Sequence, residues 1–123
     1  GMYRENEVLA AQAAQVAHAL SHPVRLQILE ALAEGEAYVM DLTTALGRRQ
    51  ANISQHLAVL REAGLVQAER EGMTVRYTLR NPQAVQAALE ALAALGHNVP
   101  FAAVGRRRRH RRGRGGGPRR FSP

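Results

Sequence analysis

The sequence predicts a mainly α-helical fold that carries one small β-hairpin, with about five helices and two strands in a single domain. Hydrophobic residues make up 46% of the 123 residues but aromatic residues only 4%, so the core has to consist of aliphatic side chains and alanine. Over residues 5–95, apolar residues recur at spacings of three and four, as in amphipathic helices. Two runs compatible with β-structure, 65–69 and 74–79, lie on either side of a glycine.

Three helices are expected in the first third of the chain. Residues 5–20 contain neither proline nor glycine and form the first helix. Pro23 suits the first position of the second helix, which Gly35 ends. A short extended stretch at 37–39 leads into the third helix, of about two turns, which Gly47 closes.

A fourth helix is expected to run to residue 62, and Gly64 supplies the left-handed residue that ends it. Its apolar face is formed by Ile53, Leu57 and Leu60. Its polar side carries Gln50, Asn52, Gln55 and His56. The arrangement predicts a helix with one face in the core and the other available to a partner.

The hairpin and a last helix complete the domain. Gly72 lies between the two β-compatible runs, where a positive φ is favourable. Asn81 can cap the last helix and Pro82 can begin it. The apolar stripe of this helix consists of Val85, Ala88, Leu89, Leu92 and Leu95.

Two regions are expected along the chain: a folded domain at 1–100 and an Arg/Gly-rich tail at 101–123, too hydrophilic to bury a core and therefore disordered. The net charge is +7, and nine of the 17 basic residues, all arginines, follow Gly105. The other eight stand against ten carboxylates, so the body carries about −2. Any affinity of the body for nucleic acid must come from locally placed groups rather than from its overall field.

Several classes of protein are excluded by composition. No apolar run approaches the roughly 18 residues that a membrane span needs, and no leader segment is recognisable, so a cytoplasmic location is expected. The absence of cysteine excludes a disulfide framework, a thiolate metal site and a cysteine nucleophile. The carboxylates are scattered, and neither a Ser, His and Asp arrangement nor a glycine-rich phosphate loop is present. No enzyme and no catalytic residue is therefore predicted.

Two short helices joined by a glycine-containing turn and followed at once by a hairpin define a winged helix-turn-helix. At residues 19–29 the sequence reads ALSHPVRLQIL, and at 52–66 it reads NISQHLAVLREAGLV. Together with 70–72 and 77–79, these stretches closely resemble the ArsR/SmtB family of winged-helix repressors. The likeness covers about residues 15–95, and its most specific part is the pattern SxHLxxLxxAGLV at 54–66.

The resemblance implies double-stranded DNA as the partner and makes the fourth helix the recognition helix. Side-chain amides pair well with adenine in the major groove, so Gln50, Asn52 and Gln55 are the candidate base readers. Ser54 and His56 match the family's conserved pair, and we expect them to hold phosphates or to support the helix. For His56, a packed structural histidine is an equally good interpretation.

Four arginines are candidates for contacts with the DNA backbone or the minor groove. Arg48 and Arg49 occupy the turn that would cross the phosphates, and Arg70 and Arg76 flank the tip of the wing, where they could enter the minor groove. The alternative for each is a solvated surface arginine. Arg49 departs from the family, which often has an N-cap residue such as serine at that position.

The resemblance also implies a homodimer formed by the first and last helices. The candidate interface residues are Val8, Val16, Leu89, Leu92 and Leu95. A two-fold dimer presents two recognition helices about 34 Å apart, so the operator should be an imperfect palindrome. The expected function is that of a sequence-specific transcriptional regulator of the repressor type. The effector stays open between an apolar small molecule, a metal at histidines, a protein partner and none.

No metal and no cofactor are predicted. Metal-sensing members of the family carry thiolates in the segment corresponding to 38–41, and another family site uses Asp and His on the last helix, yet 83–95 contains neither. The remaining candidates are His18, His22 and His97, of which the first two are spaced i, i+4. A rival function is a winged-helix protein-interaction or RNA-binding module that uses the Arg/Gly tail, although the body lacks the aromatic platform of RNA-stacking modules.

Overall fold

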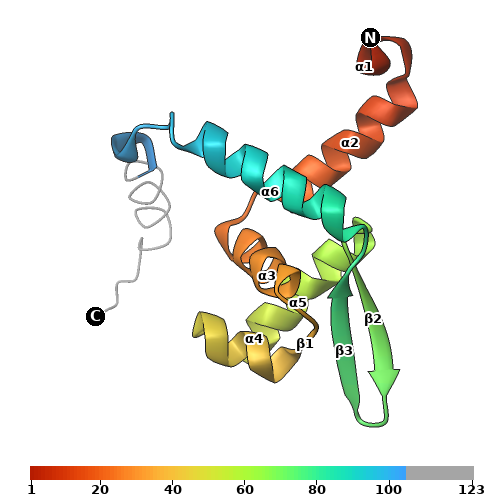
Figure 1. Ribbon diagram of the computed structural model, residues 1–123, viewed down its shortest axis with the longest axis vertical. Coiled ribbons are helices and arrows are strands. Elements are labelled where there is room, and N and C mark those ends of the chain that lie inside the picture. Colours follow the sequence, from red (N-terminus) through yellow and green to blue (C-terminus); the bar gives the residue numbers. More distant parts are fainter. Residues whose placement is uncertain (105–123) are drawn as a thin grey trace, which may run out of the picture. The chain divides into compact units, whose positions relative to one another are not determined.

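The computed structural model describes residues 1–104, and the predicted disorder of the Arg/Gly tail concerns residues that lie mostly outside this range. The elements, in chain order, are α1 (Met2–Glu5), α2 (Glu7–Ala19), α3 (Pro23–Ala33), β1 (Ala37–Tyr38), α4 (Val39–Leu46), α5 (Gln50–Glu62), β2 (Val66–Glu71), β3 (Thr74–Leu79) and α6 (Pro82–Gly96) (Figure 1). The described residues fall into two units, residues 1–89 and the residues from 90 onward. The predicted fold class, mainly α with a small β-hairpin, is confirmed.

The predicted first helix, 5–20, corresponds to α2, and the short helix α1, which the sequence did not predict, precedes it. Asn6 has an extended backbone (φ −138°), and its Oδ1 accepts a hydrogen bond from the Leu9 amide at 2.9 Å. A short polar side chain that bonds the local backbone in this way favours a helix start over a helix interior. Asn6 is therefore the N-cap of α2 and separates it from α1.

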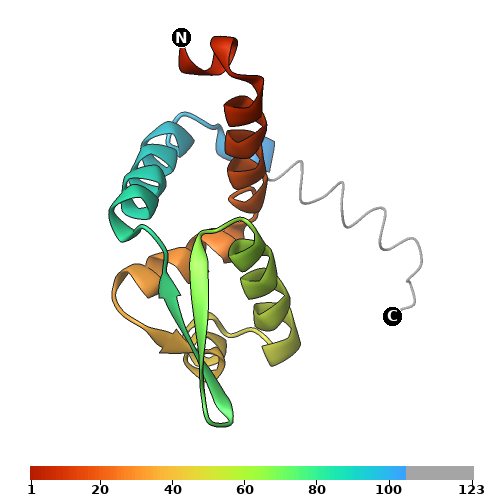
Figure 2. The same ribbon diagram turned by 90° about the vertical axis from the view of Figure 1, so that its right-hand side faces the viewer.

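The hairpin is longer and its sheet wider than the sequence predicts. β2 continues to Glu71, so only Gly72 and Met73 connect the strands, and Gly72 has a φ of 63°. β1 pairs antiparallel with β3, which gives a three-stranded sheet in the order β1-β3-β2. In both ribbon views the tip of the hairpin extends beyond the helices α4 and α5 (Figure 2).

The core fixes the orientation of the helix-turn-helix. Its fully buried side chains come mainly from α3 and α5, with one each from α4 and β2: Val24, Ile28, Leu29, Leu42, Ile53, Leu57, Leu60 and Val66. The predicted apolar face of α5 is thus confirmed, because all three of its members are at most 1% exposed. Burial of this face forces the opposite face of α5 outward.

The turn between α4 and α5 depends on a glycine. Gly47 has a φ of 63°, and its amide donates to the Thr43 carbonyl at 2.9 Å. This left-handed residue ends α4, as predicted. Only Arg48 and Arg49 then lie between Gly47 and the start of α5 at Gln50.

The last helix begins at Pro82 as predicted, but Asn81 does not adopt the extended conformation of an N-cap residue. Its φ is 54°, in the left-handed region that asparagine tolerates better than most residues. Its carbonyl accepts a hydrogen bond from the Val85 amide at 3.1 Å. Within residues 1–104, no helix combines the length and the apolar character needed to cross a membrane.

Candidate DNA interface

The outward face of α5 presents a row of polar and small side chains. Its exposed members include Gln50, Ser54, Gln55, Ala58 and Arg61. Gln50 is the first residue of the helix, and a recognition helix contacts bases mainly through its N-terminal part. The small Ala58 further along the face allows a close approach of another molecule. Of the candidate base readers, Gln50 and Gln55 are therefore accessible.

The third candidate base reader, Asn52, is placed differently. Its side chain is half-buried, and its Oδ1 is sealed from solvent without a hydrogen-bond partner in the described part of the chain. A side chain whose acceptor points inward cannot offer a donor and an acceptor together to an adenine edge without a change of rotamer. The geometry therefore favours Gln50 and Gln55 over Asn52.

The turn before α5 exposes two cations. Arg48 and Arg49 are both exposed, and Arg49 is the N-cap residue of α5 (φ −67°, ψ 150°). Its side chain forms no capping hydrogen bond, as its chemistry requires, since a guanidinium has no acceptor. The backbone amides in the first turn of α5 therefore remain available to other acceptors, such as phosphate oxygens. The helix dipole adds positive potential at this end of α5.

His56 lies against a second histidine rather than on the outward face. The rings of His22 and His56 are 4.4 Å apart between centroids, with 49° between their planes. His22 is the N-cap residue of α3, and its Nδ1 accepts a hydrogen bond from the Val24 amide at 3.2 Å. Burial, followed by the charges of His22, Arg25 and Arg48, lowers the pKa of His56. This geometry favours the supporting role, in which a neutral His56 holds α5 against the start of α3.

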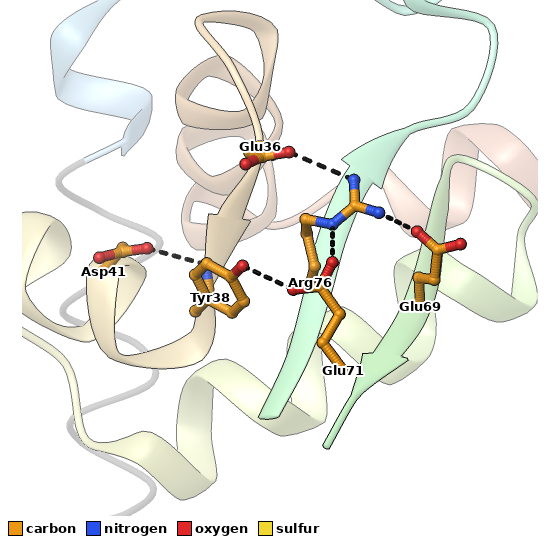
Figure 3. A network of polar contacts seen from close by, with 6 residues as sticks. All are labelled: Glu36, Tyr38, Asp41, Glu69, Glu71 and Arg76. Carbon is orange, nitrogen blue, oxygen red and sulfur yellow. Dashed lines mark hydrogen bonds and ion pairs between the residues drawn. The ribbon is translucent and has the colours of Figure 1, made fainter. Parts of the chain in front are cut away.

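The two wing arginines differ in their surroundings. Arg70 is exposed on β2, opposite Val75. Arg76, on the central strand β3, is surrounded by carboxylates: its Nε donates to Glu71 Oε2 at 2.8 Å, its Nη1 to Glu36 Oε1 at 3.2 Å, and its Nη2 to Glu69 Oε1 (Figure 3). Of these two candidate minor-groove contacts, the geometry favours Arg70, because the guanidinium of Arg76 is engaged within the protein.

A groove that the sequence did not predict lies between the recognition helix and the wing. It has a volume of about 440 Å³ and is lined by Ser54, Leu57, Ala58, Arg61, Glu62 and Tyr77. Arg61 brings a cation to this groove. Its position was predictable from the sequence, because Arg61 follows Ser54 by seven positions and residues at this spacing share one face of a helix. Tyr77 could not be placed from the sequence because its position depends on the register of the sheet.

The predicted dimer residues are only partly covered. Val8 on α2 is 67% exposed and Val16 is half-buried. On α6, Leu89 packs against the core, while Leu92 is 39% and Leu95 is 65% exposed. Within the described residues α2 buries only Ala19 and α6 only Val85, which leaves most apolar side chains of both helices available to a second subunit.

The three histidines that were candidates for a metal site do not form a cluster of metal ligands in the described residues. His22 belongs to the pair with His56, and His18 and His97 are exposed. In residues 1–104 there is no group of three or more His, Cys, Asp or Glu side chains close enough to hold a metal ion.

An exposed polar recognition helix beside a three-stranded wing defines the chain as a winged helix-turn-helix DNA-binding protein. The family model described as "Bacterial regulatory protein, arsR family" matches residues 22–68. The chain is 40% identical over 89 residues to the biofilm growth-associated repressor of Agrobacterium fabrum, covering 72% of this chain and 75% of that protein. It therefore belongs to the ArsR family of transcriptional regulators, which confirms the resemblance noted in the sequence.

Solved structures agree with this assignment. Reduced HlyU from Vibrio cholerae superimposes with a TM-score of 0.65 at 40% identity, covering 75% of this chain and 96% of that one. A possible ArsR-family regulator of Mycobacterium bovis, solved as a homodimeric winged helix-turn-helix DNA-binding domain, gives a TM-score of 0.67 at 32% identity, with 77% and 88% covered. The predicted winged-helix fold is thereby confirmed.

Proposed function

We propose that this regulator represses transcription by binding, as a homodimer, to an imperfect palindrome in double-stranded DNA. The observation that carries the proposal is the outward face of α5, which exposes Gln50, Ser54 and Gln55 directly after the cationic turn. Amides read base edges, whereas guanidinium groups and hydroxyls hold phosphates. The proposal assigns base reading to Gln50 and Gln55 and phosphate contacts to Arg48, Arg49, Ser54, Arg61 and Arg70.

Two predicted contacts are not carried into this interface. The acceptor of Asn52 points inward, and the guanidinium of Arg76 is occupied by carboxylates. His56 contributes to the proposed interface only indirectly, because it supports α5 through its contact with His22. The interface that we propose is therefore narrower than the set of polar residues on the recognition helix and wing.

Dimerisation is proposed through α2 and α6. The support is the exposure of Val8, Leu92 and Leu95, together with the homodimeric state of the M. bovis relative. The dimer would place two α5 helices about one DNA turn apart, so that each reads one half of the operator. We propose no catalytic role and no resident metal or cofactor, and we propose a cytoplasmic location, where the DNA is.

A binding assay tests this function. The full chain is titrated against the DNA upstream of its own gene and against a scrambled duplex of equal length at the same salt concentration, because salt alone changes affinity for DNA strongly. We expect at least about a thousandfold preference for the upstream duplex. Equal affinities, or tighter binding to single-stranded RNA, would favour the rival interaction module over a repressor.

A further inference from the structure

One face of the small sheet carries a polar network that ties the wing to the helix-turn-helix. The register pairs Tyr38 with Arg76 across β1 and β3, and Arg76 with Glu69 across β3 and β2. Side chains alternate along a strand, so Glu36 and Glu71 fall on the same face as these three. Figure 3 shows the carboxylates of Glu36, Glu69 and Glu71 around the guanidinium of Arg76, with the hydroxyl of Tyr38 directed at Glu71.

Arg76 is the centre of this network, and the carboxylates form its rim. The side chain of Arg76 is 25% exposed, compared with 57% for Glu36, 69% for Glu69 and 43% for Glu71. Three carboxylates around one guanidinium leave a net charge of −2. Without the guanidinium, three like charges would face one another across the sheet and push its strands apart.

The network reaches the helix-turn-helix through Tyr38. Its hydroxyl donates to Glu71 Oε1 at 2.8 Å, and its backbone amide donates to Asp41 Oδ2 at 2.9 Å. Tyr38 is the N-cap residue of α4, so the same residue begins the first helix of the helix-turn-helix and contacts the wing. The hydrogen bond to Glu71 also raises the pKa of Tyr38 above its ordinary value of 10.

We propose that Arg76 is a positioning residue of the wing: by joining Glu36, Glu69 and Glu71, it fixes the hairpin against α4, and its charge offsets one of the three negative charges beside the wing. This inference rests on the proposed DNA interface. In this proposal Arg76 acts through the network and not as a DNA contact, since Nε, Nη1 and Nη2 each donate to a carboxylate and three negative charges surround the guanidinium. Arg70, exposed on the neighbouring strand, is then the wing cation that meets phosphate.

The first test measures amide hydrogen exchange in the full chain without DNA. Arg76→Ala should speed exchange in β1, in the hairpin and in the first turn of α4 by about three- to tenfold, since a network of partly exposed ion pairs contributes modestly. Tyr38→Phe, which removes only the hydroxyl, should affect the same segments less. Arg70→Ala is the matched control, an arginine on the same hairpin that forms no ion pair within residues 1–104, and its exchange should equal that of the wild type.

The second test measures affinity for the upstream DNA duplex in a pair of glutamate variants. Glu36→Ala and Glu34→Ala each remove one negative charge two residues apart, but only Glu36 contacts Arg76. If charge alone matters, both should tighten binding equally. The positioning role predicts that Glu36→Ala binds at least about threefold more weakly than Glu34→Ala, because the wing is less firmly held.

The outcomes separate the two proposals. Wild-type exchange in Arg76→Ala, faster exchange spread evenly through α3 and α5, or equal affinities of the two glutamate variants would each overturn the positioning role. Failure of the wild-type chain to prefer its upstream duplex would overturn the proposed function instead. In that case the exchange measurement still decides whether Arg76 fixes the wing.

Discussion

Replacing Gln55 by alanine tests whether the outward face of α5 reads bases. Gln55 is exposed on this face, one residue after Ser54, and its removal leaves the buried face of the helix intact. A bidentate contact between a side-chain amide and adenine contributes about 1–3 kcal/mol of discrimination, which corresponds to a loss of about fivefold to 150-fold in operator affinity. Affinity for a scrambled duplex should stay within about twofold, since a neutral amide contributes little to phosphate binding.

Asn52→Ala is the matched control because it removes a side-chain amide from the same helix three residues earlier. The change removes a buried oxygen that has no hydrogen-bond partner in the described residues. The desolvation of such an oxygen costs about 1–3 kcal/mol, and regaining this free energy offsets the loss of packing. We expect an operator affinity within about twofold of wild type and no loss of thermal stability. Alanine also has the higher helix propensity of the two residues.

The assay is fluorescence anisotropy with labelled operator and scrambled duplexes at one salt concentration, together with thermal unfolding of each variant. The reasoning would be refuted by equal losses of Gln55→Ala on both duplexes, which would make Gln55 a phosphate contact. It would also be refuted by a larger loss of preference for Asn52→Ala than for Gln55→Ala, which would mean that Asn52 turns outward on DNA.

Four further predictions concern the rest of the chain. Leu92→Glu should place a charge in the subunit interface and split the dimer, and a dimer of unchanged mass in light scattering would contradict the interface assignment. Leu57→Ala should lower the free energy of unfolding by about 2–5 kcal/mol in chemical denaturation, because the side chain is 1% exposed. The pKa of His56 lies below its ordinary value of 6.5, so the unfolded chain takes up a proton at this side chain more readily than the folded chain. Stability should therefore fall as the pH drops through and below 6.5. Thermal unfolding should show a smaller fall for His56→Gln. Deleting residues 105–123 should flatten the plot of log K against log salt by about 0.9 for each phosphate that the tail arginines neutralise, and parallel lines would show that the tail does not touch DNA.

Local chemistry explains what the sequence could predict. The spacing of Ile53, Leu57 and Leu60 was enough to define the buried face of α5, because a helix converts spacing directly into direction. Gly47 and Gly64 marked helix ends for a similar reason, since few other residues adopt a positive φ easily. These features depend on neighbours within one or two turns, and the structure confirms them.

Features that depend on distant partners could not be predicted. The extended stretch expected at 37–39 is β1, but with two residues it gives no periodic signal that could predict its pairing with β3, in which Tyr38 lies opposite Arg76. The same pairing brings Glu36 to Arg76 across forty positions of sequence, which is why Arg76 looked like a wing cation available to DNA. For Asn52, the place at the border of the polar face left the direction of the side chain open, and the inward direction of its Oδ1 could not be predicted.

A hydroxyl-radical footprint of the full chain on its upstream duplex tests the central claim most directly. A dimer that reads DNA with two copies of α5 predicts two protected patches related by a two-fold axis, with centres about 34 Å or one helical turn apart. Gln55→Ala should weaken both patches together, because each subunit contributes the same helix. A single patch without two-fold symmetry, or uniform protection along the duplex, would contradict the account.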